Sequence, residues 1–421
     1  QGRYQGGSVA ETSMVWIPAF AEIGLGALAF GPFLLHRWSV GRWRKTPLAY
    51  PQPDKKTEPC PVTVLLPVWN EALVIETKLA NLASQEGVTF TLLAIDSAST
   101  DDTVLRIKRW LEKHPNAFAN HELIEMEHRL GKSKAVQIAL ESLESNGFDG
   151  LVCMTDADAS MPPNALKRLH GWFANPTVGA VGASARRSGG LGQEQVHRSM
   201  FELLREGESA YDSTPFLEGS LMMWRSNSFN ASQMNIGSNA DDAQIATQVR
   251  LNGLRSIHDP MVHFADVAPT TPEGQRRQKV RRAQGLQRLL LRHRKHWRSP
   301  RIGNFSKILR REAHFHLAAP LLLVGAATAS VLRWGTVLLW GMPIGTLAVL
   351  HGSLAMCELL ALTSWALHRN GMHIPGLATV GSIFTGMEHL LAAMWTSFRG
   401  RSLHMWDQHT DTRVLASKQK K

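Results

Sequence analysis

The apolar residues of this chain are segregated into two zones that flank a long polar middle. One apolar stretch runs from Met14 to Leu35 and is interrupted by a single charged residue, Glu22. The second runs from about Phe315 to Phe398. A helix of roughly 20 apolar residues is long enough to cross a bilayer. The pattern therefore predicts a membrane protein whose middle part folds outside the bilayer.

Basic residues follow the first apolar stretch instead of preceding it, as Arg37, Arg42, Arg44 and Lys45. A cleaved signal peptide has the opposite order, so we interpret the stretch as an uncleaved anchor. Because positive residues prefer the cytoplasmic side, the N-terminus is expected outside and the polar middle in the cytoplasm. The sequence thus predicts a multi-pass protein of the plasma membrane.

The second apolar zone divides into candidate segments at about 315–332, 335–350, 353–368 and 375–398. The middle two are short, which leaves open a re-entrant hairpin or one long tilted helix. The residues after Phe398 are basic and are expected in the cytoplasm. That placement predicts an even number of crossings, two or four, after the polar middle.

The formal net charge of +11 raises the question of nucleic acid as a partner. The basic residues concentrate beside the apolar zones, however, where anionic lipid headgroups attract them. We therefore predict a lipid bilayer and no nucleic acid as partner. Cys60, Cys153 and Cys357 are too far apart in sequence for a zinc motif.

The polar middle alternates short apolar runs with helical patterns. Strands are predicted at 62–66 (ended by Pro67), 90–95, 122–126 and 151–155, with helices between them. Short apolar strands separated by helices indicate a mostly parallel sheet that is covered on both faces. Ligands of such sheets bind at the carboxyl ends of the strands.

Acidic and polar side chains follow three of these predicted strands. Asp156 and Asp158 come after the fourth strand, and residues two apart on an extended chain share a face. Two carboxylates facing one ligand suit a phosphate-bearing molecule held through Mg²⁺ or Mn²⁺, although aspartates at strand ends also form ordinary turns. The other clusters are Asn70-Glu71 and Asp96 with Ser97. Since neither G-x-G-x-x-G nor G-x-x-x-x-G-K-[ST] is present, carboxylates and a metal are expected to hold the nucleotide.

Taken together, the motifs resemble family 2 glycosyltransferases, in the membrane-integrated branch of hyaluronan, cellulose and poly-N-acetylglucosamine synthases. The matching segments, in order, are 65–71 (LLPVWNE), 96–103 (DSASTDDT), Gly131-Lys132, 156–158 (DAD), 218–220 (EGS), 240–242 (ADD) and 278–282 (QKVRR). The resemblance implies a GT-A, Rossmann-like cytoplasmic domain with transmembrane helices on both sides. It also implies a nucleotide-diphosphate sugar donor, with UDP as the expected nucleotide.

Roles carried over from the resemblance fall into four groups. Asp158 is implied as the metal ligand, and Asp242 as the catalytic base with Asp241 beside it. The residues 218–220 are implied to bind the acceptor. The implied nucleotide-sugar-binding residues are Pro67, Asn70, Glu71, Asp96, Ser97, Lys132, Asp156, Gln278, Arg281 and Arg282.

The sequence departs from the family pattern at two positions, and the first affects the acceptor side. Arg282 stands where the family has a tryptophan that is associated with seating the acceptor sugar. An arginine can stack on a ring or pair with a phosphate, so a lipid-phosphate or charged acceptor is also compatible. Asp242 precedes a helical pattern, and its alternative role is to cap that helix. The acidic triplet begins with Ala240 in place of threonine or glycine, a milder change.

The expected layout is an N-terminal region with a membrane helix (1–45), a GT-A domain (46–270), an amphipathic interfacial region with the Q-x-x-R motif (271–312), membrane helices (313–398) and a basic tail (399–421). The predicted function is inverting transfer of a sugar to a growing polysaccharide. Single transfer to a lipid, such as a polyprenyl phosphate or a sphingolipid-like acceptor, is the alternative within enzymes. A membrane scaffold or transport subunit without catalysis is the alternative from another class.

Overall fold

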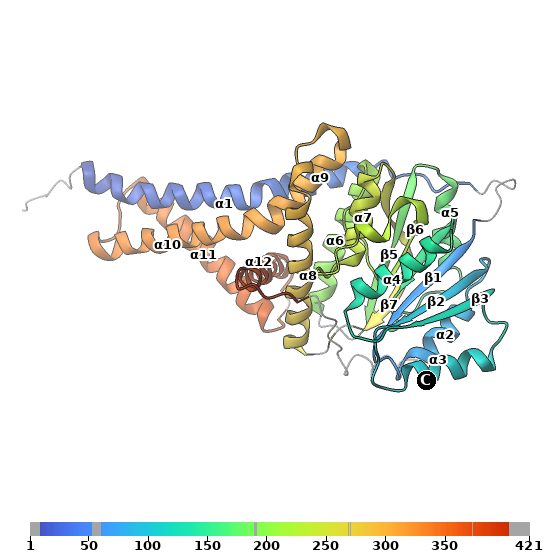
Figure 1. The fold of residues 1–421 in the computed structure, drawn as a ribbon. Coiled ribbons are helices and arrows are strands. Elements are labelled where there is room, and N and C mark those ends of the chain that lie inside the picture. Colours follow the sequence, from blue (N-terminus) through green and yellow to red (C-terminus); the bar gives the residue numbers. More distant parts are fainter. Residues whose placement is uncertain are drawn as a thin grey trace, which may run out of the picture. The chain divides into compact units, whose positions relative to one another are not determined.

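The predicted alternation of strands and helices forms a seven-stranded sheet in the order β3-β2-β1-β4-β6-β5-β7 (Figure 1). Neighbouring strands are parallel except at β6, which runs antiparallel to β4 and β5. The predicted mostly parallel sheet is confirmed. The strands are β1 (Val62–Val68), β2 (Phe90–Asp96), β3 (Asn120–Glu125), β4 (Leu151–Thr155), β5 (Val178–Ser188), β6 (Leu221–Arg225) and β7 (Arg255–Val267).

The computed structural model describes residues 9–52, 60–188, 192–267, 269, 271–372 and 374–403. Most of the predicted basic tail therefore lies outside the described residues. The chain divides into two units. Ser39–Arg310 with Ala393–Lys421 is called the sheet unit, and Gln1–Trp38 with Arg311–Ala392 is called the helical unit.

The sheet is covered on both faces because its strands bury apolar side chains alternately to each side. On β1, Val64 and Leu66 belong to one core and Leu65 to the other, and all three are fully buried. The first core includes residues of α2 (Ile75–Ala83), α3 (Thr103–Lys113) and α5 (Ala165–Gly171). The second includes residues of α4 (Lys132–Ser145) and α7 (Asp241–Leu251).

The carboxyl ends of β1, β2 and β4 lie at one edge of the sheet. Val68 pairs with Asp96, and Leu65 pairs with Met154 just before the end of β4. The prediction that Pro67 ends the first strand is wrong, because β1 continues to Val68. The pairing with β4 stops at Leu65, so a residue without an N–H is tolerated just beyond it.

Two further helices of the sheet unit are α6 (Gly192–Tyr211) and α8 (Pro272–Arg292). The Thr271 hydroxyl caps α8 by accepting a hydrogen bond from Gly274 N at 3.1 Å, and Pro272 suits the first turn. The fully buried Gln284 amide donates to Ser397 Oγ at 3.0 Å and to Arg401 O at 2.9 Å. These two hydrogen bonds attach the segment around Phe398 to α8.

Within the part of the chain that the structure describes, four helices are long and apolar enough to cross a membrane: Trp16–Trp43, Asn304–Trp340, Thr346–Arg369 and Leu377–Phe398. The last three include α10 (Ala319–Trp340), α11 (Thr346–Arg369) and α12 (Leu377–Phe398), and the first is part of α1 (Val9–Trp43). The predicted break near Arg333 is wrong, since α10 continues through it. Three candidate helices therefore follow the sheet, where two or four crossings were predicted.

Arg333 fits inside the helical unit because its charge is paired there. Its Nε lies 2.8 Å from Glu22 Oε2 on α1, and its Nη2 lies 2.6 Å from Glu358 Oε1 on α11. Nη1 lies 2.7 Å from His351 Nδ1. The arginine side chain is fully buried, so this network joins α1, α10 and α11.

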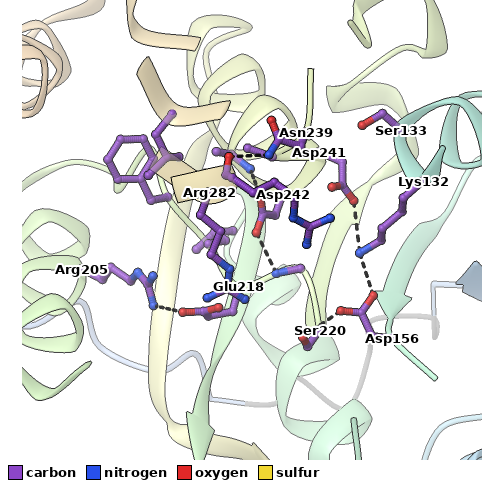
Figure 2. Close-up of a pocket in the computed structure, with 17 residues that line it drawn as sticks. Lys132, Ser133, Asp156, Arg205, Glu218, Ser220, Asn239, Asp241, Asp242 and Arg282 are labelled. Carbon is purple, nitrogen blue, oxygen red and sulfur yellow. Dashed lines mark hydrogen bonds and ion pairs between the residues drawn. The ribbon is translucent and has the colours of Figure 1, made fainter. Parts of the chain in front are cut away.

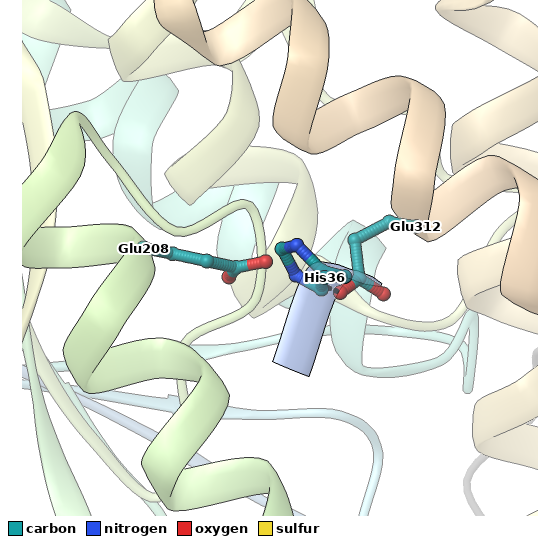
Figure 3. A group of neighbouring side chains, drawn as sticks. All are labelled: His36, Glu208 and Glu312. Atoms are coloured by element: carbon teal, nitrogen blue, oxygen red, sulfur yellow. Dashed lines mark ion pairs between the residues drawn. The ribbon is translucent and has the colours of Figure 1, made fainter. Parts of the chain in front are cut away.

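A second buried polar group lies where α9 (Asn304–Ala313) passes into a π-helical turn, His314–Ala318. Figure 3 shows His36 of α1 beside Glu312, with His36 Nε2 at 3.6 Å from Glu312 Oε1. His316 Nδ1 lies 3.3 Å from the other carboxylate oxygen. The Glu312 carboxylate is therefore held between two imidazoles.

Arg333→Met is expected to lower the free energy of unfolding of the detergent-solubilised protein by about 1–3 kcal/mol, because the partly buried Glu22 and Glu358 lose the cation between them. Thermal unfolding measures this effect. Leu338→Met, at a residue 85% exposed on the same helix, is the control and should leave the unfolding temperature unchanged. An Arg333→Met protein as stable as the wild type would show that the network does not hold the helices together.

Candidate active site

A cavity of about 160 Å³ lies in the sheet unit beside the carboxyl end of β4 (Figure 2). It brings together nine of the residues singled out from the sequence: Lys132, Asp156, Glu218, Gly219, Ser220, Asp241, Asp242, Arg281 and Arg282. These residues come from segments up to 150 positions apart in the chain. The resemblance predicted one site for these nine residues together with others that do not line this cavity, as described below.

Lys132 is the cation at the centre of the acidic groups. It is the first residue of α4, and its Nζ lies 2.6 Å from Asp156 Oδ1 and 3.3 Å from Asp241 Oδ2. Burial alone would lower the pKa of Lys132, but Asp156 and Asp241 raise it above its usual value. In turn, although burial raises the pKa of Asp156, Lys132 lowers it to about 2. Both groups are therefore charged at neutral pH.

Asp242 has a different environment from Asp156. Its Oδ2 accepts a hydrogen bond from Gly219 N at 3.1 Å, and its Oδ1 accepts one from Ala243 N at 2.7 Å. Burial and then the neighbouring Asp241 raise the pKa of Asp242 to about 6. A carboxylate with a pKa near the working pH is suited to accept a proton during a reaction.

The backbone before Asp242 is strained and tightly packed. Ala240 precedes α7 with φ 81°, a left-handed conformation that is uncommon for a residue with a Cβ. The α7 cap carries no side-chain hydrogen bond, so Asp242 is not the helix cap considered from the sequence. A Cβ at Gly285 of α8 would lie 2.6 Å from Asn239 O and 3.0 Å from Ala240 Cβ. Helix α8 therefore lies directly against this strained turn.

The predicted acceptor residues 218–220 contact the acidic groups. Ser220 Oγ donates to Asp156 Oδ2 at 2.9 Å, and Gly219 N donates to Asp242 as described above. Glu218 Oε1 lies 2.7 Å from Arg205 Nη1. The segment thus orients the carboxylates of the cavity, whatever else it binds.

Arg205 lines the cavity and was missed from the sequence. It lies on α6, outside every motif, and the ion pair with Glu218 places it there. The one sequence feature that could have identified Arg205 is its place, as a charged residue, in a helical pattern with Leu203, Leu204 and Gly207. Such a pattern is more often a solvated face, so it did not single out Arg205.

The predicted nucleobase residues form a separate cluster at the ends of β1 and β2 and do not line the cavity. Asn70 N donates to Ser99 Oγ at 2.8 Å, and Ser99 N donates to Asp96 Oδ2 at 2.8 Å. The Ser99 hydroxyl also donates to Asp96 Oδ1. Asp96, Ser97 and Glu71 are buried. With Pro67, they occupy the same sheet edge as Asp156.

Asp158 and Gln278 do not line the cavity either. Asp158 is partly buried two residues beyond Asp156, after the end of β4. Gln278 is partly buried on α8, one turn before Arg281 and Arg282. The roles assigned to both residues stay predictions.

Comparison with known proteins agrees with this arrangement. The family model described as glycosyl transferase family 2 matches residues 63–232. A solved structure, the mannosyltransferase PcManGT from Pyrobaculum calidifontis in complex with GDP-Man and Mn²⁺, is 30% identical with a TM-score of 0.72. The alignment covers 91% of this chain and 100% of that one. The chain belongs to glycosyl transferase family 2.

Among curated proteins, this family 2 glycosyltransferase is similar to the poly-beta-1,6-N-acetyl-D-glucosamine synthase of Staphylococcus aureus. The two are 22% identical over 238 residues, which is 55% of this chain and 56% of the synthase. The glycosyltransferase thus spans about half the length of the curated relatives that it matches. The GT-A fold predicted from the sequence is confirmed, together with candidate membrane helices on both sides of the domain.

Proposed function

We propose that this protein is a membrane-held glycosyltransferase that moves one sugar, with inversion, from a nucleotide-diphosphate donor to a hydroxyl of a saccharide acceptor. The observation that carries the proposal is the meeting of Lys132, Asp156, Asp241 and Asp242 in one cavity at the carboxyl edge of the sheet. A scaffold subunit would have no need for a carboxylate whose pKa is raised to about 6 beside a charged lysine.

The donor is proposed from the relatives and from the acidic residues. The solved relative contains GDP-Man, and the curated relative from Staphylococcus aureus is named as a polymer synthase. The cluster of Asn70, Glu71 and Asp96 supports binding of a nucleobase, with uracil and guanine as the candidates. Each offers ring N–H groups that a carboxylate such as Asp96 accepts.

The residues at this site fit a divalent cation whose remaining ligands come from the phosphates of the donor. Asp158 offers a hard oxygen ligand next to the sheet edge. Among the described residues, it does not belong to any cluster of three or more acidic, histidine or cysteine side chains. Mg²⁺ is often held by one or two carboxylates together with substrate phosphates. Asp158 would hold Mg²⁺ or Mn²⁺ in this way, and the cation would neutralise charge that develops on the leaving diphosphate.

The chain's own residues then have distinct tasks. Lys132 and Arg281 add positive charge beside the diphosphate, which favours departure of the leaving group. Asp242 accepts the proton of the incoming hydroxyl as its oxygen bonds to the anomeric carbon. Because Asp242 acts on the acceptor, and no carboxylate is assigned to attack the sugar, the configuration inverts.

The membrane placement is part of the proposal. The four apolar helices and the similarity to a synthase support a multi-pass protein with its sheet on the cytoplasmic side. The layout of 1–45, 46–270, 271–312, 313–398 and 399–421 remains our proposed division into functional regions.

Turnover with a panel of donors tests the function directly. The full chain in detergent, supplied with Mg²⁺ or Mn²⁺, is incubated with GDP-mannose and a set of UDP-sugars, and release of the nucleotide diphosphate is measured. Release with at least one donor that depends on the divalent cation supports the proposal. Absence of both donor binding and release across the panel would favour the scaffold.

Asp158→Asn is expected to weaken metal-dependent donor binding by about a hundredfold, because the variant replaces a charged oxygen ligand of a hard cation by a neutral one. The measurement is the Kd of the donor with and without Mn²⁺. Asp149→Asn, at an exposed aspartate just before the opposite end of β4, is the control. A donor Kd that keeps its full Mn²⁺ dependence in Asp158→Asn would remove this residue from the metal site.

A further inference from the structure

The cavity contains a cation beyond those that the donor chemistry uses. Arg282 lines the cavity from α8, adjacent to Arg281. Among the described residues, its guanidinium has no hydrogen-bond or ion-pair partner, and the residue is exposed. Figure 2 places Arg282 near Asp242 and Glu218. An arginine directed at a reaction cavity presents five N–H donors to whatever enters.

We propose that the acceptor carries a phosphate group close to its reacting hydroxyl, and that Arg282 binds this phosphate. This inference rests on the proposed function and names the acceptor class of the same site. It assigns Arg281 to the donor diphosphate and Arg282, its neighbour on the helix, to the acceptor.

The base and the arginine together define two groups on the acceptor. Asp242 has a task only if the nucleophile has a proton to lose, and a phosphate oxygen is already largely ionised at neutral pH. The nucleophile is therefore a hydroxyl. Its oxygen bonds to the anomeric carbon, its proton passes to Asp242, and the bond from that carbon to the donor diphosphate breaks with its electron pair leaving on the diphosphate. The anion that Arg282 binds is a second, spectator group.

The surroundings of Arg282 favour a phosphate that is attached to a lipid. Leu286 lies one helical turn further along α8, on the same face, and it lines the cavity with Phe216 and Leu217. A cation beside apolar side chains suits an amphiphile with a charged end. Arg205 also lines the cavity, but its Nη1 lies 2.7 Å from Glu218 Oε1. Because that charge is paired, Arg282 is the cation available for the phosphate.

The test measures binding to the full chain in nanodiscs, first loaded with GDP or UDP and Mn²⁺ so that the donor phosphate positions are filled. This first step is independent of the acceptor: failure of both nucleotides to bind would remove the proposed function itself. Geranyl diphosphate, geraniol and inorganic pyrophosphate are then titrated by calorimetry. Geranyl diphosphate is expected to bind and geraniol is not.

Arg282→Gln is expected to weaken binding of geranyl diphosphate by about tenfold to a hundredfold, the effect of losing a charge-assisted hydrogen bond. Arg282→Lys should recover part of the affinity, because it keeps the charge but not the planar fork. Arg277→Gln, at an exposed position of α8 outside the cavity, is the matched control and should keep the wild-type Kd.

The two phosphate sources give different patterns. Stronger binding of geranyl diphosphate than of pyrophosphate identifies a lipid phosphate, and equal binding identifies a water-soluble phosphate. Either pattern with the Arg282→Gln loss supports the inference. If the nucleotide-loaded protein binds no diphosphate, or if Arg282→Gln binds it as tightly as the wild type, the inference is overturned while the proposed transfer still stands.

Discussion

Asp242→Asn is expected to lower kcat by about a hundredfold to ten-thousandfold, the usual contribution of a general base, while the Kd of the nucleotide donor stays close to that of the wild type. The asparagine keeps the shape of the side chain and can accept the hydrogen bond from Gly219 N, while the one that Asp242 accepts from Ala243 N is lost. It cannot take a proton from the acceptor hydroxyl. Turnover and donor binding, measured on the same preparation, separate the two effects.

The same substitution is expected to stabilise the folded protein at pH 7.5. Burial raises the pKa of Asp242 from 3.8 to about 6, so its carboxylate is disfavoured in the folded state once the pH exceeds about 6. The cost is on the order of 1–3 kcal/mol above that pH and disappears below the unfolded pKa. Loss of activity with a higher unfolding temperature would mark Asp242 as a group kept for catalysis. Glu112→Gln, exposed on α3, is the control for both measurements, and normal turnover in Asp242→Asn would contradict the assignment.

Lys132→Met is expected to have the second largest effect, on stability and on pH dependence together. The lysine is the cation that lies within 3.3 Å of both Asp156 and Asp241. Without it, three partly or fully buried carboxylates face one another, and the free energy of unfolding should fall by about 3–5 kcal/mol. Thermal unfolding at pH 7.5 measures this loss.

The pH profile then tests what Lys132 does for the base. In the wild type, kcat/KM should fall about tenfold per pH unit below about pH 6, as Asp242 becomes protonated. Lys132 is the cation that lowers the pKa of Asp242, so its removal moves the acid limb to higher pH. Lys134→Met is the control, because this lysine contacts Gln137 on the same helix. Its kcat/KM should fall at the same acidic pH as that of the wild type. An unchanged limb in Lys132→Met would show that the lysine does not act on the base.

Much of the site followed from residues at the ends of predicted strands. Asp156 could be placed because it follows an apolar run that forms a strand, and parallel strands end at a common edge. Lys132 came from the family resemblance. Asp241 and Asp242 came from a motif. What periodicity could not give is the chain's path between these motifs. Arg205 lines the cavity because the fold places α6 beside it, and no local pattern in residues 192–211 predicts that position.

The membrane segments show a similar limit. A charged residue inside an apolar run was interpreted as a break at Arg333, since an isolated charge in a bilayer is costly. The residue is instead paired with Glu22, more than 300 positions earlier in the chain, and with Glu358. The left-handed φ of Ala240 was equally out of reach, because a glycine would have indicated it and an alanine does not.

The contact between Gly285 and the Asn239-Ala240 turn has a consequence for how the enzyme cycles. With no side chain between them, α8 cannot move closer to the turn that precedes Asp242 without displacing it. Asn239 Nδ2 also donates a hydrogen bond to Arg281 O of α8, so a helix that shifts outward either breaks this bond or carries the turn with it. We therefore expect substitutions at Gly285 to change the position of Asp242 as well as that of the helix.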